Sequence, residues 1–146
     1  MSRPKSVSRE IAVQALYQWQ MTGDDLNHII QQFLDKPESK EAQKGYFKTL
    51  VQGVVEYLGD VDTLISQFVD RDLEKVDPVE KAILRIGTYE LLHCLQVPYR
   101  VVINENINLA KRFGAEKSHA YVNSVLDKVA AKSRSVEMTG AARKRV

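Results

Sequence analysis

The side chains that most often carry catalysis or bind metals are few in this chain and lie far apart. Its three histidines, His28, His93 and His119, fall in different predicted helices, and a single cysteine, Cys94, cannot build a zinc site. Cys94 directly follows His93, but neighbouring positions on a helix point about 100° apart, so the two do not form a nucleophile–base pair. The seven glycines are scattered and form no phosphate-binding loop. We therefore expect no catalytic activity, no metal and no cofactor.

A first polar cluster that does not fit a buried helix face lies in residues 104–112. Three asparagines stand in this predicted helix, although asparagine is only a modest helix former. At helical spacing Asn104, Asn108, Lys111 and Arg112 can share one broad face. Because this face combines amide groups with positive charge, we interpret it as a candidate contact for RNA.

A second polar cluster follows Gly114, at the predicted start of another helix. The N–H groups at a helix start can hold a phosphate, and cationic and aromatic side chains there can bind and stack RNA. The candidates are Lys117, Ser118, His119 and Tyr121. A simple helix cap with Tyr121 packed in the core is the alternative explanation, and for Tyr121 alone it fits the pattern better.

The formal charge is unevenly distributed along the chain. Residues 1–9 carry +3 from Arg3, Lys5 and Arg9, and residues 132–146 carry +4, so an overall charge of +2 leaves −5 between them. Basic ends on an acidic body are typical of proteins that touch nucleic acid. Basic ends could equally well serve only to keep the protein soluble.

The elements that must position these groups are helices. Apolar residues recur at helical spacing, and strict alternation is nearly absent. Ser8 is a candidate N-cap, Gly23 a candidate stop, and Asp77 with Pro78 marks the clearest helix start, which Glu80 supports as in a capping box. We predict an all-α fold of about seven helices, near residues 9–21, 25–34, 40–58, 60–69, 78–95, 101–113 and 116–131.

Length and composition set further bounds. A chain of 146 residues with 44% hydrophobic content can build one core without disulfides or metals. No apolar run approaches 18 residues and the N-terminus lacks the apolar core of a signal peptide. Together with the single cysteine, these features predict a cytoplasmic protein without a membrane partner.

Five segments carry a resemblance to a known family. They are AVQALY at 12–17, VEKAILRI at 79–86, PYRVVINE at 98–105, LAK at 109–111 with FGAE at 113–116, and SHAYVNSVLDK at 118–128. In order and spacing, over about residues 9–131, the chain resembles the NusB family of bacterial transcription antitermination factors. The resemblance implies two packed helical bundles, about residues 9–70 and 77–131, in one compact domain. We expect a flexible basic arm at 1–8 and a flexible basic tail at 132–146.

The resemblance also implies a function and partners. Such a protein binds the boxA element of ribosomal RNA leader transcripts together with ribosomal protein S10 (NusE). The pair joins the RNA polymerase elongation complex with other Nus factors, and we expect no contact with DNA.

The family's functional positions can be carried onto this chain. The RNA side would use the N-terminal segment and the start of the last helix, and with the two polar clusters the candidates are Arg3, Lys5, Arg9, Lys111, Arg112, Lys117, Ser118, His119 and Tyr121. The S10 side would use Tyr17 and Glu80. Family members often have a denser N-terminal arginine run, which residues 6–8 interrupt here, and Lys117 stands where some relatives carry an acid.

Two other functions fit the same sequence. A similar helical domain precedes the catalytic domain of some RNA cytosine methyltransferases, although we expect no room for that domain in 146 residues. The acidic body could also serve as a protein–protein scaffold without RNA contact.

Overall fold

The computed structural model describes residues 2–139, and every regular element among them is a helix. This confirms the predicted all-α fold. The α-helices are α1 (Arg3–Thr22), α2 (Leu26–Leu34), α3 (Lys44–Glu56), α4 (Leu58–Ser66), α5 (Pro78–His93), α6 (Tyr99–Phe113), α7 (Ser118–Ser133) and α8 (Ser135–Thr139). Two 3₁₀ helices, η1 (Pro37–Glu41) and η2 (Leu73–Lys75), lie in the connections.

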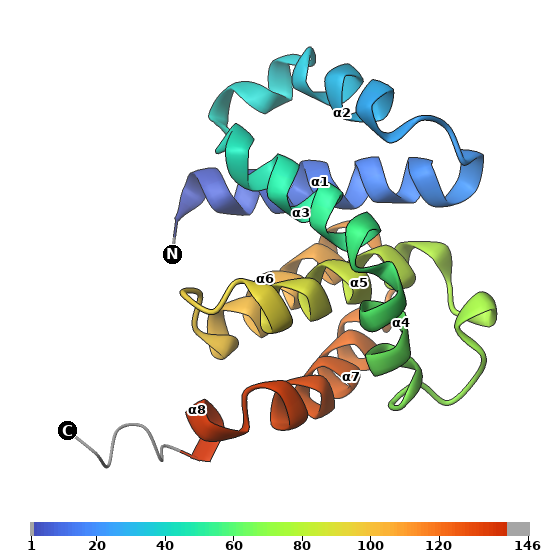
Figure 1. Ribbon diagram of the computed structural model, residues 1–146, viewed down its shortest axis with the longest axis vertical. Helices are drawn as coiled ribbons and strands as arrows, with labels where there is room; N and C mark the ends of the chain where they lie inside the picture. Colours follow the sequence, from blue (N-terminus) through green and yellow to red (C-terminus); the bar gives the residue numbers. More distant parts are fainter. Residues whose placement is uncertain (1, 140–146) are drawn as a thin grey trace.

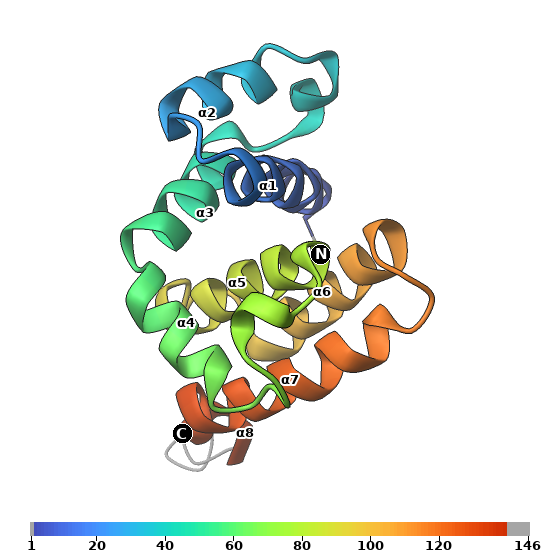
Figure 2. The ribbon, with the colours of Figure 1, turned by 90° about the vertical axis from the view of Figure 1, so that its right-hand side faces the viewer.

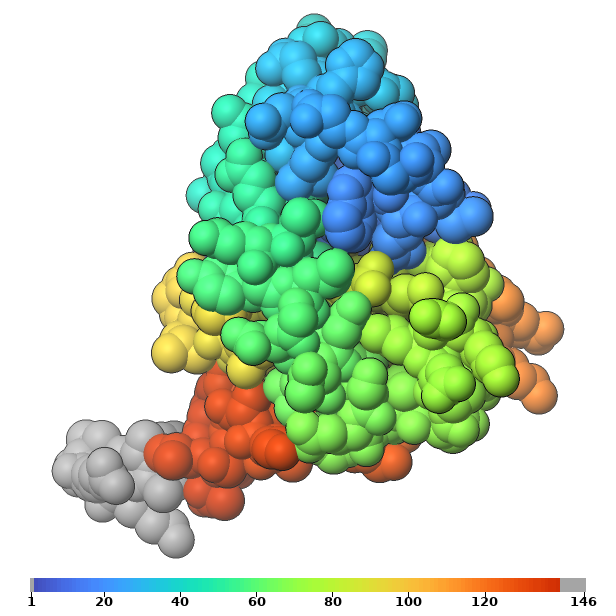
Figure 3. Space-filling view, turned by 45° about the vertical axis from the view of Figure 1, so that its right-hand side comes forward, coloured from blue at the N-terminus to red at the C-terminus, as the bar shows by residue number. Residues whose placement is uncertain are grey.

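The helices form two groups around one continuous hydrophobic core (Figures 1 and 2). Helices α1, α2 and α3 pack together at one end, and α1 and α3 rest on α5. Helices α5, α6 and α7 pack on one another at the other end. In the space-filling view of Figure 3, the lighter blue and cyan segments around α2 form the narrow end of the molecule, and the darker blue α1 lies below them.

Helix α5 lies at the centre of the core. Every residue from Ala82 to Leu91 is buried, as expected of a helix covered on all sides. Asp77 caps its start, because the Oδ2 atom accepts hydrogen bonds from the N–H groups of Val79 and Glu80. The start signal was therefore correct, but the Glu80 side chain does not complete a capping box and is free for another contact.

Helix α1 begins six residues earlier than predicted. Ser2 is its N-cap, with Oγ accepting from the Lys5 N–H, and Pro4 lies in the first turn. The proposed cap, Ser8, is instead buried in α1, where its hydroxyl donates to the carbonyls of Pro4 and Gln43. Residues 3–8 are thus the first turns of a helix and not a flexible arm.

Helix α4 belongs with the second group of helices. Its apolar side packs on α5 and α7, and Arg85 of α5 forms an ion pair with Asp62 of α4 at 2.8 Å. The two groups therefore divide after α3, near Tyr57, and not between residues 70 and 77 as the resemblance implied.

The C-terminal region is also more ordered than predicted. Helix α7 continues to Ser133, Arg134 is buried, and α8 follows. Residues 132–139 are thus helical or packed and not a flexible tail, whereas the prediction for 140–146 lies outside the described residues. No helix in the described part of the chain is both long and apolar enough to cross a membrane.

Candidate functional site

Two hollows follow one another along α1, and we name the pair the groove; of the predicted site residues, Arg3, Arg9 and Tyr17 line it. Ser6 of α1 contacts Glu105 of α6, and Glu10, further along α1, contacts Arg112, further along α6. The two helices therefore run in the same direction. The groove has a polar end of about 180 Å³, lined by Arg3, Ser6, Arg9, Glu10, Glu105, Asn108 and Leu109. Its apolar end, of about 430 Å³, is lined by Val13, Gln14, Tyr17, Gln18, Met21, Thr22, Val79 and Phe113.

Arg9 lies beneath the polar end and not on its surface. Its side chain is 3% exposed, with Nη2 at 2.8 Å from Glu90 Oε2 and Nη1 at 2.9 Å from Glu105 Oε1. Burial alone would lower the pKa of the Arg9 guanidinium, but the hydrogen bond and charge of Glu90 raise the pKa above its usual value. The prediction that Arg9 contacts RNA is therefore wrong, because its N–H groups are committed to buried carboxylates.

Tyr46 of α3 completes this buried cluster. Its hydroxyl donates to Glu90 Oε2 at 2.5 Å. Burial and the negative charge of Glu90 raise the pKa of Tyr46, so the phenol stays protonated and remains a donor. The Lys5 ammonium lies 5.0 Å from the centre of the Tyr46 ring, which holds Lys5 partly away from solvent.

Exposed cations lie on α1 and α6. The Arg3 side chain is 69% exposed and makes only a long contact with Glu41 at 3.6 Å. On α6, Lys111 is exposed, and Arg112 forms a surface ion pair with Glu10 at 3.4 Å. Such exposed pairs contribute little to stability, so these cations are available to a polyanion.

The asparagines of α6 divide between surface and core. Asn104 and Asn108 are exposed on the side of Lys111, as predicted. Asn106 is instead fully buried, where its amide donates to the Val102 carbonyl at 2.8 Å. The unusual asparagine content of this helix therefore reflects both a polar surface and a polar position in the core.

The start of α7 joins the predicted RNA side to the predicted S10 side. Lys117 is exposed, but Ser118 is buried, and its hydroxyl donates to Glu80 Oε2 at 2.6 Å. Ser118 was predicted to contact RNA and Glu80 to contact S10. The structure places the Ser118 hydroxyl inside, in contact with Glu80, so the prediction that it meets RNA is wrong in this conformation.

Tyr121 is half-buried on the first turn of α7 that faces η2. Its hydroxyl is enclosed, and burial together with the nearby Asp70 carboxylate raises the pKa of the phenol. The Arg71 guanidinium lies 5.5 Å from the ring centre. Sequence reasoning missed Arg71, because nothing in the sequence of this acidic connector indicates that its arginine lies over the Tyr121 ring. His119, beside these residues, is partly exposed.

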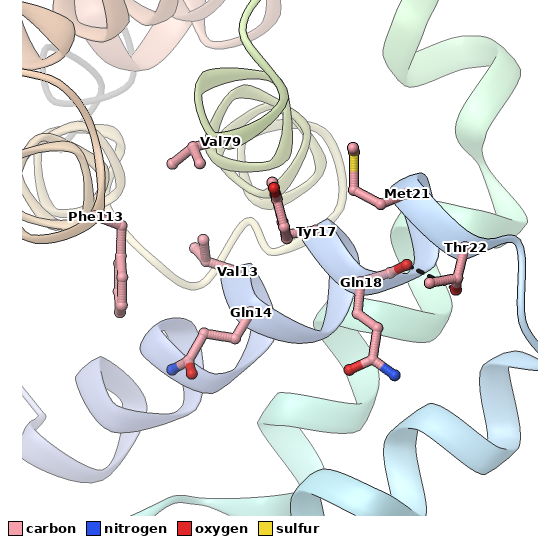
Figure 4. A pocket seen from close by; sticks show the side chains of 8 residues that line it. All are labelled: Val13, Gln14, Tyr17, Gln18, Met21, Thr22, Val79 and Phe113. Atoms are coloured by element: carbon pink, nitrogen blue, oxygen red, sulfur yellow. Dashed lines mark hydrogen bonds between the residues drawn. The ribbon is translucent and has the colours of Figure 1, made fainter.

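The apolar end of the groove exposes aromatic and aliphatic side chains (Figure 4). Tyr17 and Met21 project from α1 and are 39% and 57% exposed. Val79 from the start of α5 and Phe113 from the end of α6 complete the walls. Large apolar side chains exposed together are typical of a protein–protein contact. Sequence reasoning identified Tyr17 here but missed Phe113 and Met21, whose helical spacing also fits a buried position.

The described residues hold no group of three or more His, Cys, Asp or Glu side chains arranged to bind a metal ion. The groove therefore offers charge, amide groups and apolar surface, which are means of binding.

Comparison with known proteins places this arrangement in a family. The model of the NusB family matches residues 6–131. Transcription antitermination protein NusB of Nitrosococcus oceani is 48% identical over 145 residues, covering 99% of this chain and 97% of that protein. The protein of the same name from Hydrogenovibrio crunogenus is 45% identical over 135 residues, covering 92% of this chain and 84% of that one.

Solved structures share the fold. T. maritima NusB superimposes with a TM-score of 0.81 at 34% identity, covering 90% of this chain and 94% of that one. A crystal structure of the antitermination factors NusB and NusE in complex with dsRNA contains a chain with a TM-score of 0.77. That chain is 23% identical, with coverage of 88% and 97%, so the likeness concerns the fold alone.

Proposed function

The chain belongs to the NusB family of transcription antitermination proteins, and we propose that it binds boxA RNA of ribosomal leader transcripts jointly with ribosomal protein S10. In this proposal the pair acts in the cytoplasm and joins the transcribing RNA polymerase with other Nus factors. The family is one of transcription factors and not of enzymes, so binding is the activity to be explained.

The observation that carries the proposal is the pair of hollows that follow one another along α1, one polar and one apolar. Arg3 and Asn108, both exposed, line its polar end, and Arg112 pairs with Glu10 of the same lining. Its apolar end exposes Tyr17 and Met21. A surface that is polar with exposed cations beside it at one end, and apolar at the other, suits a nucleic acid and a protein bound side by side.

On the RNA side, phosphate contacts supply most of the affinity and base contacts supply the choice of sequence. We assign phosphate contacts to the exposed cations Arg3, Lys111, Arg112 and Lys117, and not to Lys5, whose ammonium lies over the Tyr46 ring. Four neutralised phosphates on single-stranded RNA correspond to a log–log salt slope of about −3. A flat salt dependence would contradict this assignment.

On the S10 side, the partner would cover Tyr17 and the hollow beside it. Glu80 lies next to Val79, which lines that hollow. A ribosomal protein is usually basic, so the Glu80 carboxylate and the acidic body suit it in charge.

The test is a titration of boxA RNA with the protein alone, with S10 alone and with both. We expect the mixture to bind RNA more tightly than either component, with the salt slope given above. If no mixture binds RNA, the RNA function is wrong. If S10 leaves the RNA affinity unchanged, the joint binding is wrong.

Two substitutions separate the surfaces. Lys117→Glu should weaken RNA binding and leave S10 binding unchanged, because Lys117 is exposed and caps no helix through its side chain. Tyr17→Ala should do the reverse. Tyr17 is a cleaner choice than Glu80, whose substitution would also remove the acceptor of the Ser118 hydroxyl. Equal loss of both activities in either variant would contradict the assignment.

A further inference from the structure

The polar end of the groove contains a small hollow that the proposed function leaves without a ligand. Its volume of about 180 Å³ lies below the roughly 300–1,000 Å³ of sites for drug-sized molecules. It leaves room for a single flat ring. Arg3 and Asn108, both exposed, line its mouth, and Glu105 lines it with a side chain only 7% exposed.

The two carboxylate oxygens of Glu105 have different surroundings. Oε1 accepts hydrogen bonds from the Ser6 hydroxyl and from Arg9 Nη1, the latter at 2.9 Å. Oε2 accepts from no donor in residues 2–139, although it is not among their enclosed, unpartnered polar atoms. A nearly buried carboxylate thus keeps one acceptor atom available to an incoming group. Because an ionised carboxylate only accepts hydrogen bonds, that group must be a donor.

We propose that this hollow receives the amino edge of one unpaired nucleobase, with Glu105 Oε2 accepting its N–H. The inference rests on the proposed RNA binding and names a base subsite within it. Unpaired bases of single-stranded RNA turn outwards and are recognised on their Watson–Crick edges, and carboxylates accept from the N4 amino group of cytosine. Arg3, at the mouth, is placed to hold the adjoining phosphate.

The same geometry predicts which base is rejected. Uracil presents O4 where cytosine presents its amino group, and this oxygen would face the Glu105 carboxylate. At one position of the RNA, cytosine should therefore bind more tightly than uracil by about tenfold or more.

Glu105→Gln tests the proposal by inverting the recognition. Arg9 can only donate, so it keeps the carbonyl oxygen of the new amide at the place of Oε1. The amide NH2 must then occupy the place of Oε2 and face the hollow. We expect the variant to lose the preference for cytosine or to prefer uracil at the same position.

The matched control is Glu10→Gln, which makes the same chemical change in the wall of the same hollow. Glu10 pairs with Arg112 at the surface, so this variant should keep the preference for cytosine. The measurement is RNA affinity in the presence of S10 for a set of boxA RNAs with cytosine and uracil exchanged at each position. Thermal unfolding of each variant accompanies it.

A second experiment needs no change in the protein. N4,N4-dimethylcytidine at the preferred position removes both amino hydrogens and should lower the wild-type affinity to that of uracil. The proposal is overturned if no position distinguishes cytosine from uracil, if Glu105→Gln keeps the wild-type preference, or if the dimethylated base binds as well as cytosine. Absence of any RNA binding by the wild-type protein with S10 would instead overturn the proposed function.

Discussion

Arg9 near the N-terminus and Arg134 near the C-terminus both lie inside the molecule, and both reach Glu90. Arg9 contacts the Glu90 side chain, whereas Arg134 donates to its backbone carbonyl at 3.2 Å. The charge pattern had counted both arginines among the basic ends of the chain. The positive charge of Arg9 is compensated by carboxylates, whereas that of Arg134 is surrounded mainly by carbonyl groups. This difference predicts how much stability the protein loses when each arginine is replaced.

Arg134 is surrounded by carbonyl groups. It donates to the carbonyls of Leu91 at 2.7 Å, Cys94 at 3.1 Å and Val97 at 3.0 Å, so it caps the C-terminal end of α5 and the turn that follows. Among residues 2–139 its one carboxylate partner is Glu137, at 2.6 Å. The other oxygen of Glu137 accepts from the Tyr99 N–H at the start of α6. Residues 134–137 therefore hold the α5–α6 turn at both helix ends.

Arg9, in contrast, balances buried formal charges. Glu90 and Glu105 are ionisable groups that would be costly to bury without a cation. Loss of Arg9 leaves two carboxylates in the core, whereas loss of Arg134 leaves neutral carbonyls without donors. Removing Arg9 should therefore lower the free energy of unfolding by more than removing Arg134.

Arg9→Met should therefore have the largest effect on stability. Removing one partner of a buried ion pair costs about 3–5 kcal/mol. For a domain of this size we expect the melting temperature to fall by about 10 °C or more. Thermal and urea unfolding measure it, and a loss smaller than that of Arg134→Met would contradict the comparison.

Arg134→Met should cost about 2 kcal/mol, because several carbonyls lose a charged donor but no like charges are left facing each other. Hydrogen exchange should localise the loss to the α5–α6 turn. Uniform loss of protection across α1 and α3 would show that Arg134 acts more widely than a cap.

Glu137→Gln should cost about 1 kcal/mol or less, because the Glu137 side chain is 38% exposed and the amide can still accept from the Tyr99 N–H. Urea unfolding measures this difference in the free energy of unfolding, with the same dependence on urea concentration assumed for the variant and the wild type. A cost equal to that of Arg134→Met would mean that the carboxylate, and not the carbonyls, neutralises Arg134.

Arg3→Met should have the smallest effect on stability, within about 0.5 kcal/mol, because Arg3 lies on the surface. It should weaken RNA binding several-fold and reduce the salt slope by about 0.7. This pair of results would set Arg3 apart from Arg9, which lies two turns further along the same helix. Unchanged RNA affinity would remove Arg3 from the interface.

The sequence predicted the helices of the central and C-terminal core well, because apolar spacing and cap residues agree there. Gly23 ends α1 with φ of 67°, and Asp77 begins α5 as predicted. The start of α1 was missed because its first turns carry polar residues, Ser6 and Ser8, whose partners lie in distant segments.

For the candidate site, the structure bears only on which residues are exposed. Lys111, Arg112, Lys117 and Tyr17 are exposed, as an interface requires. Arg9 was misassigned because burial of a cation depends on acids brought from other helices. A signal was present, since Glu90 continues the apolar spacing of α5 and a carboxylate there needs a cation. The sequence alone does not indicate which arginine pairs with Glu90.

The position of Glu90 between the two arginines bears on how the chain folds as it is made. Arg9 and Glu90 are separated by 81 residues, and Arg134 and Glu90 by 44. During synthesis Arg9 leaves the ribosome long before Glu90 exists, and the carbonyl of Glu90 gains its donor only after Arg134 has been added. We expect nascent chains to hold α1 in a non-native environment until late in translation, so the protein folds as one unit and not helix by helix.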